Sequence, residues 1–178
     1  MQANFSIALK HVLDHEAGFQ DDLRDNGNRL SDGRKGCTNL GVTQAAWEAY
    51  VGHKVSTADM KALTPDKVAP FYKHKYWDLV HGDDLPNGID YLAFDFAINA
   101  GTGRAIKTLQ TAVDVPADGA IGPKTLAAVR NTDSKKLINK YTDAKETFYR
   151  CLPSFTIYGK GWLARTSAVD ATAKTLIG

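Results

Sequence analysis

The chain has 178 residues, 43% of them hydrophobic and 24% charged, which is enough for one compact domain or two small lobes and is typical of a globular protein. The formal net charge of +2 is too small to indicate a nucleic-acid-binding protein. The apolar runs are too short to span a bilayer, so we expect a soluble protein without stable membrane insertion.

The N-terminal segment has the pattern of an amphipathic helix. Apolar residues recur at the spacing i, i+3, i+4, i+7 and i+8, at Phe5, Ala8, Leu9, Val12 and Leu13. We predict a helix over about residues 4–15, followed by a left-handed cap at Gly18. Lys10 and His11 lie where a signal peptide needs its apolar centre, so we expect synthesis in the cytoplasm.

Residues 19–41 are polar and glycine-rich, without apolar periodicity. The dipeptides Asn26-Gly27 and Asp32-Gly33 favour turns, so we predict a short hairpin or a long irregular loop. A loop of this length inside a compact domain is usually functional.

Helical signals dominate the rest of the chain, and strand signals are scarce, so we predict a mainly α fold. Capping residues, prolines and apolar stripes predict helices over residues 43–51, from Ser56, from Thr64-Pro65, and over 89–100, 103–113, 123–129, 134–152 and 162–176. Pro70 predicts a kink or a break in the helix that leads to Tyr76 and Trp77. The best domain boundary lies near Gly101.

Several catalytic chemistries lack their motifs. The chain has no nucleophile elbow and no phosphate-binding glycine loop. His15-Glu16 lacks the second histidine of a zinc protease, since Phe19 stands at that position. The acidic loop that contains Asp21 and Asp32 lacks the glycine and the closing glutamate of a calcium loop.

Glu16 is the remaining candidate for acid catalysis. It falls in the last turn of the predicted first helix, where a carboxylate is disfavoured by about 0.3–1 kcal/mol and the protonated carboxyl is favoured. A neutral carboxyl can act as general acid in glycosidic cleavage, and Asp25 in the following loop could supply the second carboxylate. The alternative, a solvated residue at a helix end, stays open on these grounds.

Two sets of segments resemble known families. HEAGFQDDLRD (residues 15–25), TNLGVTQAAW (38–47), KHKYWD (73–78) and DFAINAG (95–101) resemble glycoside hydrolase family 108, muramidases found among bacteriophage endolysins. The segment at residues 103–129 and YGKGWLAR at 158–165 resemble the peptidoglycan-binding module commonly fused to that family. Cys37 stands where the family usually has an acidic residue before its threonine-asparagine pair.

The resemblance implies a lysozyme-like helical catalytic lobe over residues 1–100, with a short hairpin or long loop after the first helix, and a small helical peptidoglycan-binding module over 101–178. It assigns Glu16 as the general acid, with Asp25 and Thr38 placing the attacking water. The reaction would be inverting, with the two carboxyl groups about 6.5–9.5 Å apart. No metal or organic cofactor is implied.

Other polar and aromatic residues have two interpretations each. Trp47, Tyr76 and Trp77 could stack on sugar rings, although aromatic residues at helical spacing more often form core. Asn99 could bind an N-acetyl group or cap the turn at Gly101. The cysteines Cys37 and Cys151 are expected to be free thiols, and four lysines are expected on a solvated face: Lys135, Lys136, Lys140 and Lys145.

The sequence therefore predicts a monomeric endolysin that hydrolyses the β-1,4 bond between N-acetylmuramic acid and N-acetylglucosamine of peptidoglycan. It would be made in the host cytoplasm and reach the wall through a separate membrane-permeabilising protein. The alternatives are a lytic transglycosylase that uses Glu16, a cell-wall-binding protein without catalysis, and a secreted bacterial effector with the same chemistry.

Overall fold

The computed structural model describes residues 2–16, 18–22 and 24–177. The chain divides into two compact units, one of Met1–Ala8 with Tyr76–Gly178 and one of Leu9–Lys75. Among the described helices, none is both long enough and apolar enough to cross a membrane.

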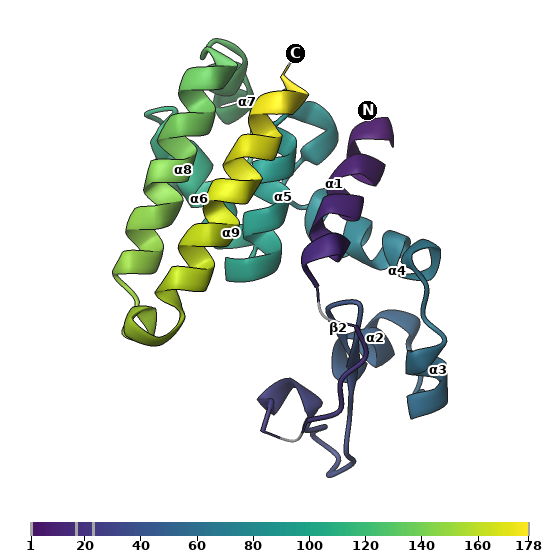
Figure 1. Ribbon diagram of the computed structural model, residues 1–178. Helices are drawn as coiled ribbons and strands as arrows, with labels where there is room; N and C mark the ends of the chain where they lie inside the picture. The colour runs from purple at the N-terminus through teal and green to yellow at the C-terminus, as the bar shows by residue number, and fades with distance from the viewer. Residues whose placement is uncertain (1, 17, 23, 178) are drawn as a thin grey trace. The chain divides into compact units, whose positions relative to one another are not determined.

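Helices make up most of the described chain (Figure 1). The α-helices are α1 (Gln2–His15), α2 (Gln44–Val51), α3 (Thr57–Lys61), α4 (Pro65–Tyr72), α5 (Ile89–Ala100), α6 (Thr102–Ala112), α7 (Pro123–Arg130), α8 (Ser134–Arg150) and α9 (Phe155–Leu176). The shorter elements are the 3₁₀ turns η1 (Asn26–Asn28) and η3 (Gly82–Asp84), the π-helical turn η2 (Lys73–Trp77), and the strands β1 (Thr38–Asn39) and β2 (Val42–Thr43).

Helix α1 confirms the predicted apolar stripe. Phe5, Ala8, Leu9 and Val12 are all buried. The predicted cap at Gly18 is wrong, because α1 ends before it is reached. The helix ends at His15 instead, where the amide of the following residue closes a tight turn on a carbonyl three residues back.

The polar loop of the Leu9–Lys75 unit ends in a short hairpin, as predicted, but its turn lies at neither of the two dipeptides on which the prediction was based. Strands β1 and β2 pair antiparallel, and Leu40 and Gly41 form the two-residue turn with φ values of 49° and 73°. Positive φ at both turn residues matches the right-handed twist of the strands. The dipeptide Asp32-Gly33 lies in a separate turn, and Asn26-Gly27 lies in η1.

The predicted caps of α2, α3 and α4 are confirmed. The Thr43 hydroxyl accepts a hydrogen bond from the third residue of α2, Ser56 and Asp59 form a reciprocal capping box, and Thr64 caps α4. Pro70 lies inside α4, which ends two residues later and continues as the π-helical η2. The predicted interruption thus takes the form of a change in helix type.

Helix α5 forms the centre of the unit that contains Tyr76–Gly178. Its residues 89–97 are all buried, because this helix is apolar on nearly every face. It packs against α6, α8 and α9, and Figure 1 shows α8 and α9 side by side. Helix α9 begins at Phe155, seven residues before the predicted start at Trp162. Gly159 lies inside this helix, and the Phe155 ring packs so closely against it that a side chain there would collide with the ring.

The loop between α6 and α7 is held by one buried amide. Gln110 is 1% exposed, and its Nε2 donates to the carboxylate of Asp118 at 2.7 Å. Its Oε1 accepts from the amide of Gly119 at 2.9 Å, where the backbone has a φ of +87°. The turn at Asp118-Gly119 is therefore fixed from inside the fold.

A buried ionic cluster joins α5, α8 and α9. The Lys145 ammonium lies 2.5 Å from one carboxylate oxygen of Asp95, and Arg165 lies 2.8 Å from the other. Burial by itself raises the pKa of Asp95, but attraction by the two cations outweighs burial and holds this pKa below 3.8. Lys145 is 1% exposed, so the prediction that it belongs to a solvated face is wrong.

Candidate active site

Glu16 lies directly after α1, half-buried, against the turn of the hairpin. A methyl group added at Gly41 would lie 2.6 Å from the Tyr72 hydroxyl and 2.8 Å from Oε2 of Glu16. Tyr72 is 1% exposed, and its hydroxyl donates to the Leu40 carbonyl at 2.8 Å. The carboxyl of Glu16 is thus placed beside a fixed phenol and a turn that only glycine fits.

Asp25 lies in the polar loop, with its carboxylate held from two sides. It caps η1, and its Oδ1 accepts from the Gly27 amide at 2.8 Å. Its Oδ2 accepts from the side-chain amide of Gln20 at 2.7 Å. The side chain stays exposed, so its remaining lone pairs can accept hydrogen bonds from water.

Thr38 begins β1 and is joined to Asp25 through two amide side chains. The backbones of Thr38 and Gln20 exchange hydrogen bonds of 2.8 and 2.9 Å. The Thr38 hydroxyl donates to Oδ1 of Asn28 at 2.9 Å, and Asn28 Nδ2 donates to Oε1 of Gln20 at 2.6 Å. Asn28 is fully buried, so this relay has little freedom to rearrange.

The structure therefore brings Asp25 and Thr38 into one hydrogen-bonded chain and places Glu16 at the turn of the same hairpin. The sequence did not indicate Gln20 or Asn28 as part of this arrangement. Both residues lie in a polar loop without periodicity, so the sequence pattern does not distinguish a buried asparagine or glutamine side chain from a solvated one. Tyr72 was noted only as an aromatic residue, not as a partner of the hairpin turn.

An ionic clamp anchors the same loop to α2. Arg34 forms two hydrogen bonds to the Glu48 carboxylate, at 2.9 and 2.7 Å, and Glu48 also accepts from the Val55 amide at 3.0 Å. The Arg34 guanidinium is the main cause that lowers the pKa of Glu48 to about 2. The clamp fixes the loop that carries Asp25 against a regular helix.

The two cysteines are free thiols, as expected. Cys37 is buried, donates to the Gln44 side chain at 3.4 Å, and has a pKa raised by burial. Its position before Thr38 therefore belongs to the core, and no charged group occupies it. Cys151 is exposed.

The proposed sugar-stacking aromatics have different surroundings. Trp47 is half-buried and packs near Tyr50 and Phe71, and Tyr76 is also half-buried. Trp77 is fully buried and donates its indole N–H to Asp83 at 3.1 Å. Because Trp77 has no exposed ring face, its role is that of core, and stacking on a sugar is excluded.

Asn99 lies exposed on the last turn of α5. Its Nδ2 donates to the Asp95 carbonyl four residues earlier at 2.7 Å. It does not cap the turn at Gly101, whose amide bonds to Ala97. The side-chain oxygen of Asn99 makes no hydrogen bond within the described residues and is available to a ligand.

Within the part of the chain that the structure describes, no three histidine, cysteine, aspartate or glutamate side chains gather in a way that could hold a metal ion. The chemistry that the site offers is that of carboxyl groups, a hydroxyl and amides.

Gly41 provides a test of the packing around Glu16. We expect Gly41→Ala to destabilise the protein and to displace the Glu16 carboxyl, because the new methyl group would meet Tyr72 and Glu16 in a backbone of positive φ. Gly33→Ala is the matched control, since Gly33 has a φ of +83° but nothing within 4 Å. Unfolding in denaturant and wall-lytic activity measure both variants. We expect Gly33→Ala to cost about 1 kcal/mol and little activity, and equal losses in the two variants would contradict the close packing.

Comparisons with known proteins agree with this architecture. A family model described as Glycosyl hydrolase 108 matches residues 9–101, and one described as Predicted Peptidoglycan domain matches residues 104–167. Among solved structures, the chain is similar to SagA of Brucella abortus, with 42% sequence identity, 99% of this chain and 97% of that chain covered, and a TM-score of 0.84. No match is found among curated proteins.

These matches confirm the predicted mainly α, lysozyme-like fold with a C-terminal helical lobe. They also make peptidoglycan the binding partner of the C-terminal part. The chain is a peptidoglycan-degrading glycosidase and belongs to the glycosyl hydrolase 108 family.

Proposed function

We propose that the enzyme hydrolyses the β-1,4 bond between N-acetylmuramic acid and N-acetylglucosamine, with Glu16 as the general acid. The observation that carries the proposal is the position of the Glu16 carboxyl, half-buried at the turn of the hairpin whose first strand holds Thr38 and the relay to Asp25. Acid-assisted glycoside hydrolysis needs one carboxyl and one separately held carboxylate, and here they lie beside the hairpin turn and in the loop hydrogen-bonded to the first hairpin strand.

In the proposed reaction, Glu16 donates its proton to the glycosidic oxygen as the bond to the sugar breaks. Asp25 accepts a proton from the attacking water. The Thr38 hydroxyl donates its hydrogen bond to Oδ1 of Asn28. Its oxygen can therefore accept a hydrogen bond from the attacking water and orient that water. A water that attacks opposite the departing sugar inverts the anomeric centre.

We propose residues 1–100 as the catalytic lobe and 101–178 as the wall-binding module. Trp47, Tyr76 and Asn99 are the proposed substrate contacts that remain, because each has an exposed or half-buried side chain. The role as an endolysin, the monomeric state and the release by a separate permeabilising protein remain predictions.

Digestion of purified peptidoglycan, followed by reducing-end assay and mass spectrometry, tests the reaction. Hydrolysis produces reducing N-acetylmuramic acid ends, whereas 1,6-anhydro ends would assign the enzyme as a lytic transglycosylase. Binding to the wall without release of either product would overturn catalysis altogether.

Asp25→Asn separates the two reactions further. We expect this variant to lower the hydrolysis rate by about 10²–10⁴-fold, because the water loses its base. Asp21→Asn, at an exposed carboxylate of the same loop, is the control and should stay within about twofold of wild type. A fully active Asp25→Asn enzyme would remove Asp25 from the mechanism.

A further inference from the structure

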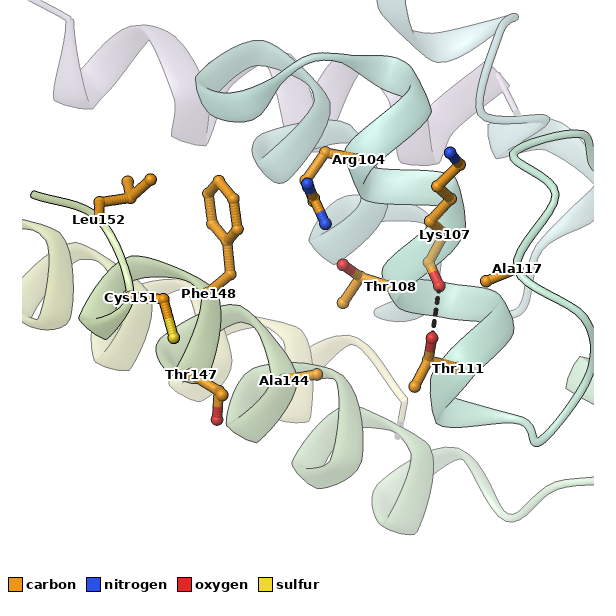
Figure 2. A pocket seen from close by; sticks show the side chains of 10 residues that line it. All are labelled: Arg104, Lys107, Thr108, Thr111, Ala117, Ala144, Thr147, Phe148, Cys151 and Leu152. Carbon is orange, nitrogen blue, oxygen red and sulfur yellow. Dashed lines mark hydrogen bonds between the residues drawn. The ribbon is translucent and has the colours of Figure 1, made fainter.

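A groove of about 770 Å³ lies between α6 and α8, outside the proposed catalytic lobe. Figure 2 shows the side chains of Arg104 and Thr108 on α6 toward Phe148 on α8, whereas the Lys107 side chain extends away from α8. The groove lies within the part of the chain that matches the peptidoglycan domain, and its walls are mostly apolar.

The groove is positively charged. Arg104 and Lys107 line it, and none of its described lining residues is acidic. Neither cation forms a salt bridge within the described residues, but Lys107 lies close enough to Asp118 for its charge to help lower the pKa of that carboxyl. Arg104 is therefore the cation of the groove that has no carboxylate partner among the described residues. The Arg104 guanidinium lies over the Phe148 ring, 4.7 Å from its centroid, which positions it and leaves its N–H edges for a planar anion.

The floor of the groove holds a hydroxyl without a partner. Thr108 is 8% exposed, and its side chain makes no hydrogen bond within the described residues. By contrast, Thr111 and Thr147 at the rim donate to carbonyls of their own helices at 2.9 and 2.8 Å. No described side-chain N or O atom is both buried and without a partner, so the Thr108 hydroxyl is open to the groove, where it can bind a ligand atom in place of water.

We propose that this groove binds the peptide stem of peptidoglycan, with a stem carboxylate on Arg104 and a peptide carbonyl or amide on Thr108. The proposal rests on peptidoglycan as the substrate, and it adds the surface of the protein that binds the peptide part of this polymer. Alanine methyl groups and the aliphatic part of a diamino acid fit apolar walls. The glycan strand fits them less well, because its sugars are uncharged in the intact polymer and Arg104 already covers one face of Phe148.

Titration with the free tetrapeptide L-Ala-γ-D-Glu-meso-diaminopimelyl-D-Ala tests the proposal. The peptide contains no glycosidic bond, so its binding is independent of the proposed role of Glu16. Calorimetry gives the Kd of the full-length protein. Alkylation of Cys151, which is exposed and lines the groove while Cys37 is buried, reports the location. We expect bound peptide to slow Cys151 alkylation at least about fivefold.

Arg104→Glu should weaken peptide binding at least tenfold, and Thr108→Val should weaken it about threefold. Arg104 is the third residue of α6, where an acidic side chain suits the helix dipole, so the variant should fold. Lys135→Glu, the same charge change at an exposed position of α8 outside the groove, should bind like wild type.

Three results would overturn the proposal. The peptide could leave the rate of Cys151 alkylation unchanged, or Arg104→Glu could bind the peptide as tightly as Lys135→Glu does. N-acetylglucosamine oligosaccharides could also protect Cys151 from alkylation as well as the peptide does. Loss of lysis in Glu16→Gln with peptide binding intact would support both proposals. Peptide binding by a chain that releases no sugar ends would overturn the proposed hydrolysis alone.

Discussion

Glu16→Gln is expected to lower the hydrolysis rate of peptidoglycan by about 10²–10⁴-fold while the chain folds normally. Glutamine keeps the shape of the side chain beside Gly41 and Tyr72 but has no acidic proton for the glycosidic oxygen. The leaving sugar would then depart as a poorly stabilised alkoxide. Initial rates of reducing-end release from purified walls, with circular dichroism for the fold, measure the effect.

Asp14→Asn is the matched control for this variant. Asp14 stands at the same end of α1, and its exposed carboxylate pairs with Lys10 at 3.0 Å. An exposed i,i+4 pair contributes about 0.3–0.5 kcal/mol, so the control should keep both stability and activity. A Glu16→Gln enzyme that clears walls at the wild-type rate would show that the general acid is another group.

Asp95→Asn is expected to destabilise the protein by about 3–5 kcal/mol. The substitution removes the negative charge that both Lys145 and Arg165 contact and leaves the buried Lys145 ammonium without that partner. The cluster joins three helices around the core, so unfolding should become easier for the whole unit. Chemical denaturation monitored by circular dichroism gives the change in the free energy of unfolding.

Asp114→Asn is the control, since it breaks an ion pair with Lys140 that is exposed on both sides. Its loss should cost at most about 1 kcal/mol. The wild type should also show an acid transition that Asp95→Asn lacks. Because the folded-state pKa of Asp95 lies below 3.8, its contribution is fully present above pH 3.8 and is lost as the pH falls through the folded-state pKa. Equal stability losses in the two variants would contradict a special role for the buried cluster.

Local sequence signals predicted most helix boundaries because those boundaries depend on neighbouring residues. Thr43, Ser56 and Thr64 cap their helices with their own side chains. The same local reasoning failed at Gly18 and at the start of α9. There the outcome depends on packing, since a ring from the first turn of α9 occupies the space beside Gly159.

The sequence by itself determined the mainly α class, the hairpin, the family and the candidate residues Glu16, Asp25 and Thr38, because these depend on periodicity, capping and short motifs. Only the tertiary structure decided which side chains are buried and which are joined. Trp77 is buried in the core, Lys145 is enclosed with Asp95, and the buried Asn28 side chain links Gln20 to Thr38 by hydrogen bonds. A polar residue has the same identity in the sequence whether its side chain is solvated or buried, so only the folded structure shows which environment the side chain has.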